Sequence, residues 1–97
     1  MALVMMYRTE TKPDRVEKLD KLRSEFMDIY ESHDVDIVGH WQDSERPHVS
    51  YYMARYEDED EYEKTVRELR EDEKYQELTD RLHEIRTDFE ATHLTPV

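Results

Sequence analysis

The stretch VDIVGHWQDSERPHVSYYMARY, residues 35–56, decides the fold of this 97-residue chain. Its two outer segments, residues 35–43 and 48–56, are rich in β-branched and aromatic side chains, which favour strands. The residues between them, Ser-Glu-Arg-Pro, have the composition of a turn. The pattern therefore predicts two antiparallel strands joined as a hairpin.

One strand and one helix are expected before this hairpin. The segment ALVMMYRTE, residues 2–10, is rich in apolar residues and predicts a strand. Between residues 13 and 32 the apolar side chains recur at spacings of three and four, which predicts an amphipathic helix. Pro13 and Asp14 are residue types that suit the first turn of such a helix.

Two helices and a final strand are expected after the hairpin. Asp58 followed by Glu61 fits a capping box, and Asp72 can cap a second helix. From about residue 85 apolar and polar side chains alternate again, which predicts a strand with one solvated face. The order is βαββααβ in a single domain of residues 1–97. Crossover helices on one face of an antiparallel four-stranded sheet describe a ferredoxin-like α+β sandwich.

Both faces of the predicted sheet are largely apolar. Because side chains alternate along a strand, we expect Val35, Ile37 and Trp41 on one face of the second strand and Val38 and His40 on the other. Helices that each carry one apolar stripe can cover only one face of the sheet. We therefore predict a homodimer, a dimeric α/β barrel in which a second copy covers the other face and buries roughly 1,500 Å² in total.

The composition limits the partners that can be expected. The chain has 26 acidic and 14 basic residues, a formal net charge of −12, and no cysteine. Such a surface repels nucleic acid and anionic membranes, so neither is an expected partner. The first residues lack the basic region and cleavage pattern of a signal peptide, so a cytoplasmic location is expected. The acidic, lysine-poor composition also predicts a protein that works at high salt.

Several short motifs resemble those of known proteins. The segment 38–41, Val-Gly-His-Trp, is similar to a strand motif of NIPSNAP domains, and the segments 56–58, Tyr-Glu-Asp, and 72–75, Asp-Glu-Lys-Tyr, are similar to later motifs of that family. Lys12-Pro13 and the final Leu-Thr-Pro at 94–96 also fit. The chain thus resembles the dimeric α+β barrel superfamily, NIPSNAP domains first and antibiotic biosynthesis monooxygenases second. The resemblance implies a pocket between the sheet and its helices, which some members use for cofactor-free oxygenation or for haem.

Two histidines of the hairpin are candidate site residues. With a loop of about five residues, His40 and His48 would face each other across the strands, within reach of one metal ion or one ligand carboxylate. A metal site would need a third ligand, for which His93 is the candidate. Ordinary strand-end histidines are the simpler interpretation, and no metal site is predicted. His33 and His83 are expected on helix surfaces without a role.

Aromatic side chains are the other candidates. Tyr and Trp combine apolar area with a polar group, which suits an amphipathic ligand, although the same residues could also form a packed core. Tyr7, Trp41 and Tyr51 are the expected ligand-binding residues, together with His48, because their strands should be neighbours. In a cofactor-free oxygenase, His40 would serve as the catalytic base.

Three functions remain open from the sequence. The first is a small homodimer that binds a small, partly apolar ligand between sheet and helices, without a cofactor. The second is a monooxygenase, cofactor-free or haem-dependent. The third is a non-catalytic interaction module.

Overall fold

The computed structural model describes residues 2–97, and its elements follow the predicted order. Three helices and one short 3-10 turn accompany four strands. In chain order the elements are β1 (Leu3–Thr11), η1 (Pro13–Arg15), α1 (Val16–Ser32), β2 (Asp36–Gln42), β3 (Val49–Tyr56), α2 (Glu59–Glu71), α3 (Glu73–Ile85) and β4 (Arg86–Leu94). The last strand begins at residue 86, where the hydrophobic period changes from helical to alternating.

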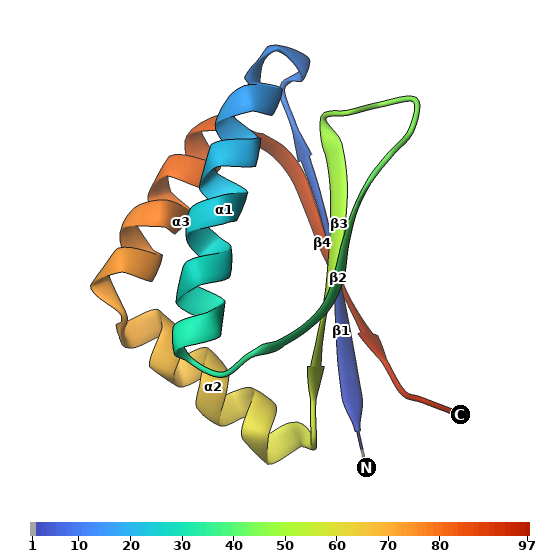
Figure 1. The fold of residues 1–97 in the computed structure, drawn as a ribbon, viewed down its shortest axis with the longest axis vertical. Coiled ribbons are helices and arrows are strands. Elements are labelled where there is room, and N and C mark those ends of the chain that lie inside the picture. The colour runs from blue at the N-terminus through green and yellow to red at the C-terminus, as the bar shows by residue number, and fades with distance from the viewer. Residues whose placement is uncertain (1) are drawn as a thin grey trace.

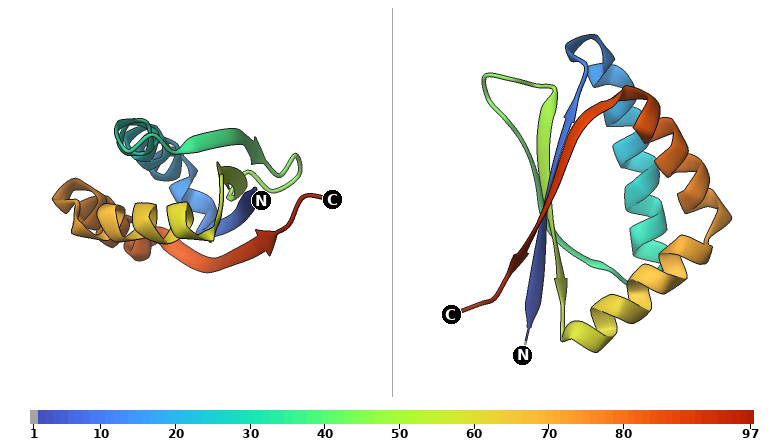
Figure 2. Two further views of the ribbon diagram at one scale, coloured as in Figure 1. Left: turned by 90° about the horizontal axis from the view of Figure 1, so that it is seen from below. Right: turned by 180° about the vertical axis from the view of Figure 1, so that it is seen from behind.

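The four strands form one antiparallel sheet with the order β2-β3-β1-β4. The helices α1, α2 and α3 all lie against one face of this sheet (Figure 1). Seen from below and from behind, the sheet twists, and the helices remain on the same side of it (Figure 2). The ferredoxin-like α+β fold with helices on one face is therefore confirmed.

Carboxylates begin the two helices that follow the hairpin. The side chain of Asp58 accepts a hydrogen bond of 2.8 Å from the amide of Glu61, as the capping pattern predicts. Asp72 accepts bonds from the amides of Lys74 and Tyr75, which stabilise the start of α3.

Asp72 also joins α3 to α1. The Nε2 atom of His33, at the carboxyl end of α1, lies 2.9 Å from Oδ2 of Asp72, and the side chain of His33 is only 19% exposed. His33 was expected on a helix surface, but its ring is held between two helices because the α1 terminus meets the α2–α3 junction.

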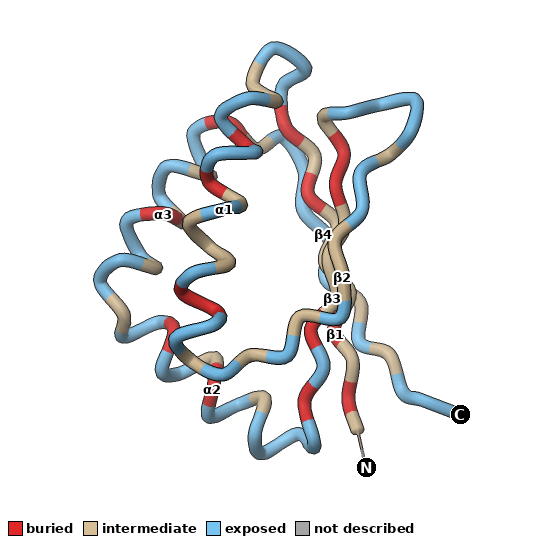
Figure 3. Tube along the Cα trace, in the orientation of Figure 1, coloured by how far each residue is buried: buried red, intermediate tan, exposed pale blue. Residues whose placement is uncertain are grey.

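The buried residues lie in β1, β3 and all three helices (Figure 3). One cluster joins the three helices and the other lies at the end of the sheet where β1 begins. The first contains Leu19, Leu22, Ile29, Tyr30, Leu69, Leu78 and Ile85, and the second contains Leu3, Met5, Ala54 and Tyr56.

A β-bulge changes the alternation of β2. Ile37 lies opposite Ala54, but the next residue of β3, Met53, lies opposite Gly39, so Val38 is an extra residue in the ladder. The expectation that Ile37 and Trp41 share a face is therefore wrong. Beyond the bulge, the imidazole of residue 40 faces the helices and Trp41 faces away.

The outer face of the sheet, which points away from the helices, carries a mixture of apolar and charged side chains. Its centre is apolar, with Met6 opposite Met53 and Trp41 opposite Tyr51. Within residues 2–97, no helix lies against this face (Figure 1). None of the described helices is long and apolar enough to cross a membrane.

Candidate functional site

A cavity of about 610 Å³ lies between the inner face of the sheet and the helices. Aromatic side chains dominate its wall, and six of the seven tyrosines of the chain contribute to it. These six are Tyr7, Tyr30, Tyr52, Tyr56, Tyr62 and Tyr75. The volume lies within the usual range for small-molecule sites. The edge strand β4 contributes Phe89 and Ala91 to the wall, and both residues are exposed to solvent.

Four rings form a stacked series across the sheet, which we call the aromatic row. Its members come one from each strand, in the spatial order β2, β3, β1 and β4: His40, Tyr52, Tyr7 and Phe89. The successive ring centroids are 5.4, 4.7 and 6.0 Å apart, with interplanar angles of 11°, 24° and 21°. Since side chains stand upright on a sheet, the ring edges of this row face the helices.

The far side of the cavity is tied to the aromatic row by hydroxyl groups. The hydroxyl of Tyr30 on α1 lies 3.0 Å from that of Tyr52 on β3. Phe26 and Tyr75 pack around Tyr30, with ring centroids 6.1 and 6.5 Å from it. The helices and the sheet are therefore held apart by large rings rather than by close aliphatic packing, which leaves the space between them.

The tyrosines of the wall are neutral hydrogen-bonding groups. Burial raises the pKa of Tyr7, Tyr30 and Tyr52 well above the ordinary value, because the charged phenolate would be poorly solvated there. Burial likewise raises the pKa of Tyr56 to about 12. The wall thus offers hydroxyl groups and ring edges to a ligand, without phenolate charge at neutral pH.

Two polar atoms in the wall are buried without a hydrogen-bond partner. They are Nε2 of His40, on β2, and Nη2 of Arg23, on α1. Nη2 of Arg23 lies 3.0 Å from Oδ1 of Asp20, but the contact is an ion pair that lacks the alignment of a hydrogen bond. Burial lowers the pKa of His40, and the nearby charge of Arg23 lowers it further. His40 is therefore a neutral imidazole at pH 7.

The structure separates His40 from His48. His40 lies opposite Tyr52 in the ladder, whereas His48 lies in the loop before β3. The expected pairing of the two histidines is wrong because the loop is longer than expected. Asp43 folds this loop by accepting hydrogen bonds from the amides of Glu45 and Arg46.

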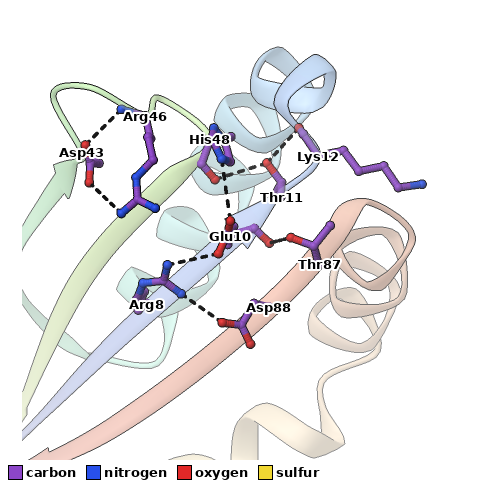
Figure 4. Close-up of polar contacts among 9 residues, drawn as sticks. All are labelled: Arg8, Glu10, Thr11, Lys12, Asp43, Arg46, His48, Thr87 and Asp88. Carbon is purple, nitrogen blue, oxygen red and sulfur yellow. Dashed lines mark hydrogen bonds and ion pairs between the residues drawn. The ribbon is translucent and has the colours of Figure 1, made fainter.

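His48 instead lies in a polar group at one end of the sheet (Figure 4). Its Nε2 atom is 3.7 Å from one carboxylate oxygen of Glu10, and the other oxygen of that carboxylate pairs with Arg8 at 3.1 Å. Arg8 makes a second ion pair of 3.1 Å with Asp88. His48 is thus a neighbour of surface charges and does not line the cavity, so the structure corrects its expected place in the pocket.

The three aromatic candidates also divide between the two faces. Tyr7 lines the cavity at the centre of the aromatic row. Trp41 and Tyr51 face each other on the outer face, and the indole is 50% exposed. The structure corrects their expected place in the pocket. The bulge turns Trp41 outward, and Tyr51 points to the opposite face from its neighbour Tyr52, which lines the cavity.

Most of the cavity wall was not predicted from the sequence. Tyr52 and Tyr30 are central to it, yet neither was selected as a site residue. The available signal was the helical spacing of Phe26 and Tyr30, which places two rings on the sheet-facing side of α1. Among residues 2–97, no three His, Asp or Glu side chains are placed to share a metal ion.

Comparison with known proteins establishes the fold. The chain is similar to a NIPSNAP family protein from Agrobacterium tumefaciens, with a TM-score of 0.90 and 20% identity over 100% of this chain and 94% of the other. A NIPSNAP domain protein from Burkholderia xenovorans gives a TM-score of 0.86 at 22% identity, covering 98% and 94% of the two chains. An antibiotic biosynthesis monooxygenase gives 0.79 at 12% identity, covering 98% of each. This chain has their ferredoxin-like fold.

The sequence comparisons are narrower in extent. A family model described as the HalX domain matches residues 61–94, which run from α2 to the end of β4. No curated protein matches the chain. The structural neighbours therefore confirm what the sequence motifs predicted, a fold similar to that of NIPSNAP proteins and antibiotic biosynthesis monooxygenases.

Proposed function

We propose that this protein binds a small, partly apolar molecule in the cavity between sheet and helices. The observation that carries the proposal is the cavity of about 610 Å³ whose wall combines the aromatic row with buried polar atoms that have no partner. Apolar walls with a few convergent polar groups are typical of small-molecule sites. A non-catalytic interaction module would need no such space.

A neutral fluorescent probe tests this function. N-phenyl-1-naphthylamine is small enough for the cavity and becomes strongly fluorescent in apolar surroundings. We expect the protein to bind this probe in saturable fashion, because the wall is largely aromatic. Ala91→Trp places a large ring in the cavity wall on β4, opposite Tyr7, and is expected to weaken binding at least tenfold.

The control for this experiment is Ser44→Trp, which adds the same ring in the exposed hairpin loop. It is expected to leave probe binding unchanged. Equal binding by both variants, or no binding by the natural chain, would show that the cavity is not a ligand site.

The functional unit that we propose is a homodimer joined through the outer face of the sheet. Support comes from the helices, which cover only the inner face, and from the apolar centre around Met6 and Met53. An uncovered apolar sheet face favours association or aggregation. A second copy supplies the same face, so the apolar residues of the two sheets can meet.

Cofactor-free oxygenation is the second candidate function. It is favoured by the likeness to an antibiotic biosynthesis monooxygenase and by the neutral imidazole of His40, a residue that lines the cavity. A neutral imidazole can accept a proton from a phenol or an activated C–H group, and the resulting electron-rich anion can be oxidised by O₂. Oxygen uptake with a panel of hydroquinones tests this candidate. His40→Ala should abolish the uptake, whereas His48→Ala, outside the cavity, should not.

Haem is the alternative occupant for an oxygenase. The unpaired Nε2 of His40 is the atom of the wall that could ligate its iron, and the aromatic row could contact the porphyrin. Titration of the protein with haemin should then shift the Soret band, and His40→Ala should remove the shift. Unchanged spectra would exclude haem binding.

A further inference from the structure

Two residues that line the cavity each hold a buried nitrogen atom without a hydrogen-bond partner. Nη2 of Arg23 comes from α1 and Nε2 of His40 from β2, and both atoms are buried without a hydrogen-bond partner. A buried donor without a partner costs free energy, so such atoms are rare in folded proteins. Two such atoms on residues that line one cavity are therefore the starting point for inferring the class of its ligand.

The two groups line the same cavity. The guanidinium charge of Arg23 disfavours protonation of His40, in addition to the effect of burial. His40 therefore stays neutral and carries one ring proton, which can lie on Nε2 as a donor. A permanent cation beside a neutral donor is an arrangement that favours an anionic oxygen acceptor.

The charged residues of the cavity wall also favour an anionic ligand. The charged residues that line the cavity are Arg23, Arg70, Arg86 and Asp80, so cations outnumber anions three to one. In the complete chain the balance is the reverse, with 26 acidic and 14 basic residues. The cavity is thus a locally basic site in a strongly acidic protein, which excludes amines as its preferred ligands.

Asp20 does not remove this preference. Its Oδ1 atom is 3.0 Å from Nη2 of Arg23, but without hydrogen-bond alignment, and its side chain is 53% exposed. Asp20 is also absent from the cavity wall. Arg23 therefore lines the cavity, whereas its ion-pair partner does not.

We propose that the cavity binds an aromatic or similarly apolar carboxylic acid, whose carboxylate lies between Arg23 and His40 and whose ring packs along the aromatic row. This inference rests on the proposed function and specifies its ligand class. The carboxylate accepts from the guanidinium and from the imidazole, and the apolar body contacts Tyr52 and Tyr7. The remaining wall tyrosines can donate to further oxygen atoms of the ligand.

Three ligands with one ring system test the inference: 2-naphthoate, 2-naphthamide and 2-naphthylmethylamine. Their dissociation constants are measured by displacement of N-phenyl-1-naphthylamine. We expect naphthoate to bind on the order of tenfold more tightly than the amide, because charge-assisted hydrogen bonds are the stronger ones, and the amine to bind most weakly. Arg23→Met should remove the preference for naphthoate and leave binding of the amide unchanged.

Arg67→Met is the matched control, since it removes one positive charge from an exposed position outside the cavity wall. Arg67→Met should preserve the preference for naphthoate over the amide. His40→Phe should weaken naphthoate binding while keeping a ring in the aromatic row. If Arg23→Met does not fold, the order of the three ligands on the natural chain still decides the matter.

The outcomes separate the two proposals. Equal binding of the three ligands, or tightest binding of the amine, would overturn the carboxylate site while the ligand-binding function stands. If the fluorescent probe itself does not bind, both proposals fail.

Discussion

The indole of Trp41 lies over Gly39 on the outer face of β2, so close that a Cβ atom at position 39 would come within 2.8 Å of the ring. The glycine is required by this close approach and not by its backbone angles, because its φ is not positive. Trp41 is the only tryptophan of the chain, so its fluorescence reports on the outer face directly.

Gly39→Ala is expected to displace the indole with little effect on stability. The ring is half-exposed and can rotate away, and alanine loses less backbone entropy than glycine on folding. The free energy of unfolding should change by less than about 1 kcal/mol, while the tryptophan emission shifts to longer wavelength. Urea unfolding and emission spectra check both; a large loss of stability with an unchanged spectrum would contradict the packing described.

Met53→Glu is expected to dissociate the proposed dimer. Met53 lies at the centre of the outer face opposite Met6, where a second copy would bury a carboxylate without a partner. Sedimentation equilibrium should give twice the chain mass of 11.9 kDa for the natural protein and a single chain for the variant. Ser24→Glu adds the same charge on the exposed side of α1 and should remain dimeric. A natural chain that is monomeric and soluble when folded would refute the dimer.

The hydroxyl contact between Tyr30 and Tyr52 is expected to stabilise the junction of α1 and β3. Replacement of either residue by phenylalanine keeps the ring and removes one partner of the 3.0 Å hydrogen bond. Each variant should lose about 1 kcal/mol of unfolding free energy, and a double-mutant cycle should give a coupling of about 0.5–1.5 kcal/mol. Additive effects of the two substitutions would mean that the hydroxyls do not bind each other in solution.

Asp72 is expected to make stability depend on pH in the acid range. The hydrogen bond with His33 and the amides at the start of α3 lower the pKa of the Asp72 carboxyl. Its ionised form therefore stabilises the fold at pH values above the unfolded-chain pKa of about 3.9. This contribution is lost as pH falls through the lower pKa of the folded state. Asp72→Asn keeps a capping side chain without the charge, so it should be less stable than the natural chain at pH 7.

The difference between Asp72→Asn and the natural chain should shrink as the pH falls from about 5 to about 2. Thermal unfolding at a series of pH values measures it. A difference that stays constant over this range would show that the charge of Asp72 does not stabilise the fold. Asp60→Asn, on an exposed residue in the first turn of α2, serves as a control for loss of a surface carboxylate.

High salt is expected to stabilise the protein. A net charge of −12 on 97 residues repels itself in dilute buffer, and this repulsion is screened as the Debye length falls from about 10 Å at 0.1 M to about 3 Å at 1 M salt. The thermal midpoint should therefore rise across a KCl series followed by circular dichroism. Full stability in dilute buffer would contradict the adaptation to salt that the composition predicts.

The fold could be predicted because its signals are local. The caps at Asp58 and Asp72, the helical spacing of apolar residues and the change of period near residue 85 each act within a few residues. These signals agree with one another, which is the condition under which a sequence specifies one structure. The single apolar stripe of each helix likewise predicted that the helices cover only one face of the sheet.

The candidate site could be predicted only in part, because its geometry depends on register. Tyr7 was selected because its strand neighbours the others, and alternation could not show the extra residue at Val38 that reverses the faces of His40 and Trp41. The loop before His48 is likewise set by hydrogen bonds to Asp43, which a short motif does not reveal. His40 on β2 and Arg23 on α1 line the same cavity, which neither segment alone could reveal.

The extra residue at Val38 also bears on how such chains can diverge. Loss of Val38 would restore a regular ladder and leave His40 where it is, opposite Tyr52. Gain of one residue just after Gly39 would instead rotate the imidazole outward and bring the indole inward. Which side chains of β2 line the cavity therefore depends on the number of residues in the strand as well as on their identity.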